Sequence, residues 1–135
     1  GAVVATGGAR HGGTGYFFQP TVLTNVPENA QIMQEEPFGP IAIINPVASL
    51  DEAIAQANAV PYGLAGYAFT NRADYIDRII NEVEVGNLSI NTLEASMPET
   101  PFGGVKSSGY GREGGAEGLD NYMTIKHVWH SAQIV

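Results

Sequence analysis

The chain has 135 residues, 44% hydrophobic and 15% charged, which suits a globular domain with one core. Its formal net charge of −8, with only six lysines and arginines, argues against nucleic acid or an anionic membrane surface as a partner. There is no cysteine, which excludes disulfides, zinc thiolate sites and a cysteine nucleophile within these residues.

The first third of the chain predicts strands around a glycine-rich turn. Residues 1–15 begin with a short apolar run and continue as a turn, and residues 16–26 alternate well enough to form a second strand or hairpin arm. One helical turn is expected over residues 30–34. An isoleucine-rich run over residues 41–47, bounded by prolines, predicts a buried strand.

Two helices are predicted next, each followed by a strand. Ser49 and Glu52 have the spacing of a capping box, which predicts a helix over residues 50–60. A strand is expected over 64–70, a second helix opening at Asn71 and Asp74 and ending at Gly86, and a strand over 87–91. Alternation of strand and helix predicts an α/β fold with an open, mainly parallel sheet and crossover helices.

Residues 93–135 contain a loop and then an apolar tail. Residues 93–115 are rich in glycine and proline, so they are expected to be loop. The glycine spacing there is a weak phosphate-cradle signal, because no strand precedes it, and Lys106 and Arg112 are interpreted as solvated charges. Residues 121–129 alternate as an edge strand that pairs either with a second subunit or within its own domain.

The stretch QEEPFGP, residues 34–40, places two acids before a phenylalanine that is braced by prolines. Adjacent side chains on extended chain point in opposite directions, so Glu35 and Glu36 cannot flank one bond as a hydrolase pair. Phe38 suits a ligand platform because the prolines fix the backbone around it. The simpler alternative is an acidic helix end with Phe38 in the core. The three histidines, His11, His127 and His130, lack the spacing of a metal site.

Several motifs together resemble one enzyme family. EEPFGP, then ANAVPYGLAGYAFT, then NLSINTLEASMPETPFGGVKSSGYGREGG resemble, in this order, the C-terminal part of the aldehyde dehydrogenase superfamily. The resemblance covers essentially the whole chain. It implies the family's catalytic-domain fold over residues 1–120 and an oligomerisation strand in residues 121–135.

The resemblance also implies roles for particular residues. Glu36 matches the glutamate that binds the nicotinamide ribose hydroxyls of NAD or NADP, and Phe38 matches the aromatic near the nicotinamide. Phe102 matches the aromatic of the inner substrate tunnel, and Glu94 and Ser96 fall at the tunnel mouth. Glu113 resembles a buried glutamate tied to a lysine, with a possible supporting role in proton relay.

The family oxidises an aldehyde to a carboxylic acid with NAD(P)⁺ and water, through a cysteine nucleophile and a glutamate that activates water. The resemblance places both groups upstream of Gly1. We therefore expect a fragment that does not turn over aldehyde alone and that exposes apolar surface and self-associates. Which of NAD and NADP is used is left open, because the residues that read the adenosine are also upstream.

The expected substrate is a semialdehyde with a distal carboxylate, such as succinate semialdehyde, with Ser96 against that carboxylate. A betaine-aldehyde-like or broad aliphatic specificity stays open. No apolar run reaches the roughly 18–20 residues that span a bilayer and no signal peptide is visible, so a cytoplasmic location is expected. A homodimer or homotetramer joined through the C-terminal strand is also expected. The alternative function is a non-catalytic α/β assembly module.

Overall fold

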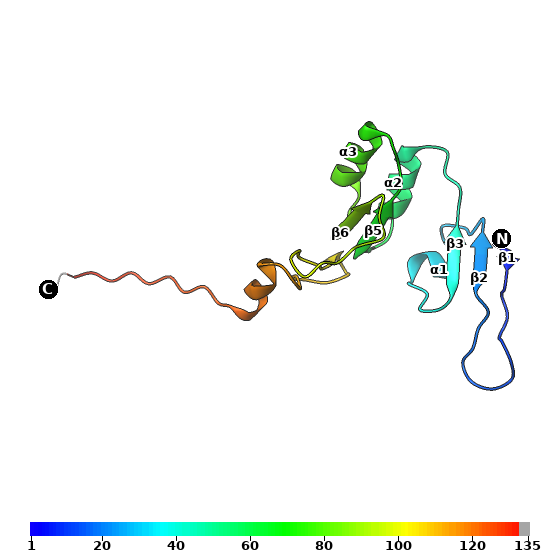
Figure 1. Ribbon diagram of the computed structural model, residues 1–135, viewed down its shortest axis with the longest axis horizontal. Helices are drawn as coiled ribbons and strands as arrows, with labels where there is room; N and C mark the ends of the chain where they lie inside the picture. The colour runs from blue at the N-terminus through cyan, green and yellow to red at the C-terminus, as the bar shows by residue number, and fades with distance from the viewer. Residues whose placement is uncertain (133–135) are drawn as a thin grey trace. The chain divides into compact units, whose positions relative to one another are not determined.

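The computed structural model describes residues 1–132 (Figure 1). Contacts group the chain into two compact units, Gly1–Ala53 and Ile54 onward, where composition predicted one. The apolar side chains that are buried are few: Val26 in the first unit, and Ile54 and Ile79 in the second. Cores this small leave most apolar side chains exposed. No helix among the described residues is long and apolar enough to cross a membrane.

The first unit is built on a three-stranded sheet in the order β1-β2-β3. β1 (Val3–Thr6) pairs antiparallel with β2 (Thr21–Thr24), and β2 pairs in parallel with β3 (Ile41–Ile44), so the predicted strands form. The short helix α1 (Gln31–Gln34) connects β2 to β3, as expected. The turn between β1 and β2 begins at Gly7, whose φ of 73° and close approach to the carbonyl of Pro20 require glycine.

The second unit contains one parallel strand pair and one short antiparallel pair. β5 (Ala65–Ala68) pairs in parallel with β6 (Asn87–Ile90), and α3 (Ala73–Glu82) is the connection between them (Figure 1). β4 (Tyr62–Gly63) pairs antiparallel with β7 (Val105–Lys106). A 3-10 helix, η1 (Glu117–Tyr122), follows the glycine-rich loop. The α/β class is therefore confirmed, but the described residues form three small sheets instead of one.

Helix α2 (Leu50–Asn58) lies at the boundary of the two units and begins as predicted. The backbone N–H of Glu52 donates to Ser49 Oγ at 3.2 Å, and the Glu52 carboxylate accepts from the N–H of Ala48 at 2.7 Å. These contacts satisfy backbone groups that would otherwise have no partner at the start of the helix.

Helix α3 differs from the prediction at both ends. Its N-cap is Arg72, with no side-chain cap, instead of Asn71. The helix ends at Glu82, four residues before Gly86, because Val83 takes extended backbone and the N–H of Glu84 donates to Asn58 Oδ1 at 2.9 Å. A side chain from α2 thus determines where α3 ends, which a local stop signal cannot reveal.

An asparagine side chain extends each parallel pair by one position. Asn45 follows β3 and exchanges two hydrogen bonds with the backbone of Val26, at 2.9 and 2.8 Å. Asn91 follows β6 and exchanges two with the backbone of Thr70, at 2.8 and 2.9 Å. In both cases the amide imitates a peptide group and fixes the direction in which the chain leaves the sheet.

The predicted C-terminal strand is not seen in residues 121–132. Residues 123–132 have no regular secondary structure, and Met123, Ile125, Val128 and Trp129 are exposed. No strand of the described chain pairs with this tail, and an unpaired strand is not stable by itself. Residues 133–135 of the predicted strand region lie outside the described part.

Candidate functional site

The two adjacent acids after α1, Glu35 and Glu36, make different contacts. Glu35 is the C-cap of α1: its N–H donates to the carbonyl of Gln31 at 2.9 Å, and its carboxylate accepts from Gln31 Nε2 at 3.0 Å. Glu36 is exposed. Both acids are at the surface, but the backbone of Glu35 closes the helix and its carboxylate is hydrogen-bonded to Gln31.

Phe38 stands on a braced turn and is 94% exposed. Gly39 N–H donates to the carbonyl of Pro37, and Ile41 N–H donates to the carbonyl of Gly39, both at 2.8 Å. Thr21 N–H donates to the carbonyl of Pro40 at 2.8 Å, which ties the turn to β2. The alternative that Phe38 belongs to the core is wrong for this unit. A rigid turn with an exposed phenyl ring suits a flat, apolar ligand surface.

Phe102 and Glu113 are brought together in the second unit. Their backbones exchange two hydrogen bonds of 2.7 Å, which form an isolated antiparallel bridge. Phe102 is half-buried and the Glu113 side chain is exposed. The expectation of a buried Glu113 tied to a lysine is not met within this chain, since the ion pair of Lys106 is with Glu84. Burial of Glu113 needs a covering surface that residues 1–132 do not supply.

Glu94 and Ser96 lie exposed on the loop between β6 and β7. The carbonyl of Glu94 accepts from Ser89 Oγ at 2.7 Å, so the loop is tethered to the strand before it. Ser96 is two residues beyond this tether. The structure thus places the tunnel-mouth candidates on one held segment, in the same unit as Phe102.

Two open hollows flank the glycine-rich loop. One, of about 710 Å³, is lined by Pro61, residues 104–107 and residues 109–112. The other, of about 590 Å³, includes Phe102, Arg112, Glu113 and Tyr122 in its lining. Arg112 contributes to both, and its Nη1 donates to the carbonyls of Gly104 at 3.0 Å and Gly111 at 2.7 Å. Arg112 therefore holds the loop in shape.

Lys106 anchors the same loop to the end of α2. Its Nζ donates to the carbonyls of Asn58 at 3.0 Å and Val60 at 3.3 Å and forms an ion pair with Glu84. Its side chain is 26% exposed. The interpretation of Lys106 and Arg112 as solvated charges is therefore wrong: both bind carbonyls that lack partners in a helix or sheet.

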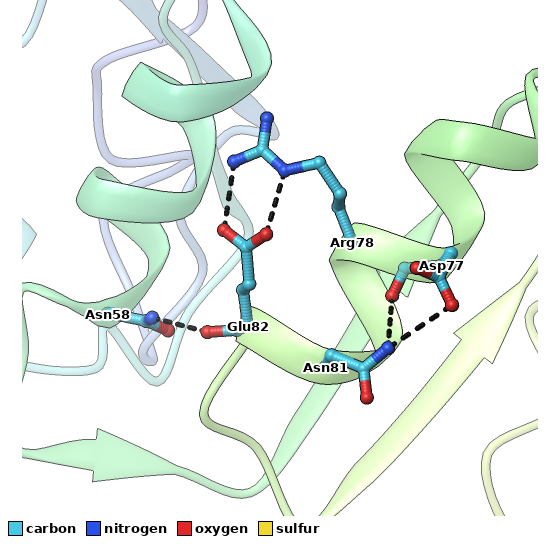
Figure 2. A network of polar contacts seen from close by, with 5 residues as sticks. All are labelled: Asn58, Asp77, Arg78, Asn81 and Glu82. Carbon is cyan, nitrogen blue, oxygen red and sulfur yellow. Dashed lines mark hydrogen bonds and ion pairs between the residues drawn. The ribbon is translucent and has the colours of Figure 1, made fainter.

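Figure 2 shows the polar network by which α2 and α3 are joined. Asn58 Nδ2 donates to the carbonyl of Glu82 at 2.7 Å, and Arg78 binds the Glu82 carboxylate through two hydrogen bonds, at 2.7 and 2.9 Å. Hydrogen bonding to Arg78 lowers the pKa of Glu82. Near the start of α3, hydrogen bonding to Arg72 likewise lowers the pKa of Asp74.

Sequence reasoning missed Asn58, Glu84, Asn87 and Ser89 as residues that hold the loop. For Asn87 and Ser89 a signal was present, because two polar residues separated by one position lie on the same face of a strand. Asn58 and Glu84, which bind Lys106, are separated from it by 48 and 22 positions in the sequence, so no local pattern predicts these contacts. No cluster of side chains suited to a metal ion occurs in residues 1–132.

Comparison with known proteins identifies relatives of the chain. The model of the aldehyde dehydrogenase family matches residues 1–128. The 4-(hydroxymethyl)benzenesulfonate dehydrogenase TsaD1 of Comamonas testosteroni is 52% identical over 118 residues, which are 87% of this chain and 25% of that protein. A succinate-semialdehyde dehydrogenase of Paenarthrobacter nicotinovorans is 45% identical over 128 residues, 95% of this chain and 28% of that protein.

A solved structure agrees with these matches. The crystal structure of betaine aldehyde dehydrogenase from Staphylococcus aureus in complex with NAD⁺ superposes with a TM-score of 0.86 and 40% identity, over 95% of this chain and 26% of that one. The chain thus spans about a quarter of the length of the proteins it matches.

Proposed function

The chain belongs to the aldehyde dehydrogenase family, and we propose that it is the C-terminal part of an enzyme that oxidises an aldehyde to a carboxylic acid with NAD or NADP. In this proposal residues 1–135 supply a contact to the nicotinamide ribose, part of the substrate-tunnel wall and a subunit contact. The observation that carries the proposal is the braced, exposed Phe38 two residues after the exposed acid Glu36.

The residues present fit the nicotinamide end of such a cofactor. The Glu36 carboxylate is an acceptor with two oxygens, which matches the two hydroxyl donors of a ribose. The Phe38 ring limits where a flat ring can lie beside it. Glu35, held by Gln31, leaves Glu36 as the acid available to a ligand. When bound, the cofactor supplies the hydride acceptor of the oxidation.

The loop after β6 provides the wall against which the substrate is oriented. Phe102 offers an apolar surface beside the glycine-rich loop, and Ser96 offers a hydroxyl that donates to a distal carboxylate of a semialdehyde. Glu94 stands at the outer end of this wall. Glu113 has a supporting role at most, since its carboxylate is exposed in this chain.

A semialdehyde with a distal carboxylate is the substrate class that we favour. One relative at 45% identity is a succinate-semialdehyde dehydrogenase, and the relative at 52% identity acts on an arylsulfonate. Both names describe molecules with an anionic group. A donor such as Ser96 suits an anion of either kind, so it supports the class more strongly than one particular compound.

The tail supports a second, compatible role in assembly. Met123, Ile125, Val128 and Trp129 are exposed within seven positions, and four large apolar side chains so placed favour burial against another chain. We propose a homodimer or homotetramer joined through residues 121–132. A non-catalytic assembly module, the alternative function, would need this tail but would have no use for Glu36 and Phe38.

A chimera tests the proposal. The 128 residues of this chain that align with the Paenarthrobacter nicotinovorans succinate-semialdehyde dehydrogenase, at 45% identity, replace the matching segment of that enzyme. The chimera is expected to form NAD(P)H from succinate semialdehyde, whereas the 135-residue chain alone is expected to form none, because it contains no cysteine. A chimera that folds and assembles like the parent but oxidises no aldehyde would contradict the proposal.

A further inference from the structure

Strand β6 buries two polar side chains on one face. Asn87 and Ser89 are 9% and 6% exposed, and they are separated by one position, so both point to the same side of the strand. Strands in parallel pairs ordinarily bury apolar side chains. Buried polar groups destabilise the fold unless they form hydrogen bonds, so the partners of these two side chains are informative.

Those partners lie on the two arms of the loop 92–104. Ser89 Oγ donates to the carbonyl of Glu94 at 2.7 Å, on the arm that leaves β6. Asn87 Nδ2 donates to the carbonyl of Gly103 at 2.9 Å, on the arm that returns, and to the carbonyl of Leu64 at 2.8 Å. One face of one strand therefore holds both ends of the segment that contains Ser96 and Phe102.

Close backbone contact holds the returning arm independently. A Cβ atom at Gly86, the residue before β6, would collide with the carbonyl oxygen of Gly103. A Cβ atom at Gly103 would lie 2.8 Å from the Cδ atom of Arg112, and Gly104 is buried. The carbonyl of Gly103 thus has little room to move away from the Asn87 amide.

We propose that Asn87 and Ser89 are positioning residues that set the span of the loop 92–104 and, through it, the placement of Ser96 and Phe102. The ligand that the loop meets, an aldehyde, rests on the proposed function; the two tethers do not. Seven residues, 95 to 101, lie between Glu94 and Phe102, so a shift at either tether moves the candidate specificity residues directly. Such a shift weakens the hold on a substrate that these side chains orient.

Carbonyl and amide NMR signals of the 135-residue chain test the tethers without any activity measurement. Ser89→Ala is expected to move the carbonyl ¹³C signal of Glu94, and Asn87→Ala that of Gly103. Amide exchange at Phe102 should become about tenfold faster in Asn87→Ala, because one neutral hydrogen bond is lost from its arm. Ser107→Ala and Asn81→Ala are matched controls on exposed positions of the same unit and should move neither carbonyl signal.

Ser89→Thr keeps the hydroxyl and should leave the Glu94 signal at its wild-type position. If Ser89→Ala does not fold, Ser89→Thr carries the test, and a moved Glu94 signal in it overturns the proposal. Unchanged Glu94 and Gly103 signals in folded Ser89→Ala and Asn87→Ala also overturn it, whatever happens to the unfolding midpoint. An inactive chimera would contradict the proposed function but leave these signals, and the tethers, as predicted.

In an active chimera, Ser89→Ala should raise KM for succinate semialdehyde about tenfold with a smaller change in kcat, since the binding wall is displaced and the reacting groups are not. A fall in kcat of about tenfold with an unchanged KM would overturn the placement of Ser96 by this tether.

Discussion

Replacing Lys106 by methionine should release the glycine-rich loop from the end of α2. The substitution keeps most of the aliphatic stem and removes the ammonium group. It therefore removes donors from the carbonyls of Asn58, at 3.0 Å, and Val60, at 3.3 Å, and leaves Glu84 without its ion-pair partner. The two carbonyls then depend on water for hydrogen bonds.

The size of the effect follows from the exposure of the groups. Hydrogen bonds to a charged donor contribute about 1.5–3 kcal/mol when well shielded. The Glu84 side chain is 56% exposed, so its ion pair adds at most a fraction of about 1 kcal/mol. The positive charge near a helix C-terminus adds about 0.3–1 kcal/mol. With Lys106 itself 26% exposed, we expect a total loss of about 1–2 kcal/mol.

Urea unfolding followed by circular dichroism, with amide exchange as a local readout, measures this loss. With a slope of about 2 kcal/mol/M, in the middle of the usual range, the midpoint should fall by about 0.5–1 M. The amide of Ser107, which donates to the carbonyl of Pro61 at 2.9 Å, should exchange about tenfold faster. The matched control is Lys126→Met in the exposed tail. Equal midpoints and equal Ser107 exchange in the two variants would refute the assigned role of Lys106.

Three further predictions concern α3, the loop and the substrate. Because hydrogen bonding to Arg78 lowers the pKa of Glu82, the pair stabilises α3 fully above the ordinary carboxyl pKa and loses this effect as the pH falls through the lowered value. The loss of unfolding free energy at acid pH should therefore be less steep in Glu82→Gln, and an unchanged acid dependence would contradict the pairing. Gly86→Ala should destabilise the second unit by about 2 kcal/mol or more, since its Cβ atom collides with the Gly103 carbonyl, and a wild-type midpoint in urea would show that the two glycines do not touch. In the chimera, Ser96→Ala should raise KM for succinate semialdehyde about tenfold and KM for propanal little, and equal effects would remove Ser96 from the substrate site.

The elements that local patterns specify could be predicted from the sequence. The capping box of Ser49 and Glu52 predicts α2, and both of its residues make capping contacts. The apolar runs that became β3, β5 and β6 carry strand-forming residues between turn signals, so their positions follow from neighbours in sequence.

The features that depend on distant partners could not be predicted. Gly86 is a plausible helix stop by type, yet α3 ends earlier because Asn58 binds the backbone of Glu84. The alternating tail has strand character, but no strand among the described residues pairs with it. Ile80 of α3 shows the same limit: it is exposed although it is a large apolar residue on a helix, since periodicity does not say how wide a face of the helix the fold covers.

The candidate site divides along the same line. The motif around Phe38 predicted a ring braced by prolines and suited to a ligand platform, and the backbone turn and the exposure of Phe38 agree with that physical interpretation. The expected burial of Glu113 is not seen, because it requires a surface beyond residues 1–132. The tethers from Asn87 and Ser89 were missed because their partners are backbone carbonyls, which every residue has and which therefore give no signal in the sequence.

The most direct test of the central claim compares the two adjacent acids in the chimera. The account predicts that Glu36→Gln raises KM for NAD(P)⁺ about tenfold, because a charge-assisted hydrogen bond to the ribose is weakened. Glu35→Gln, the matched control, should leave that KM within about twofold, because the Glu35 carboxylate is bound to Gln31. A larger rise for Glu35→Gln than for Glu36→Gln, or no rise for either, would contradict the assignment of Glu36 to the cofactor.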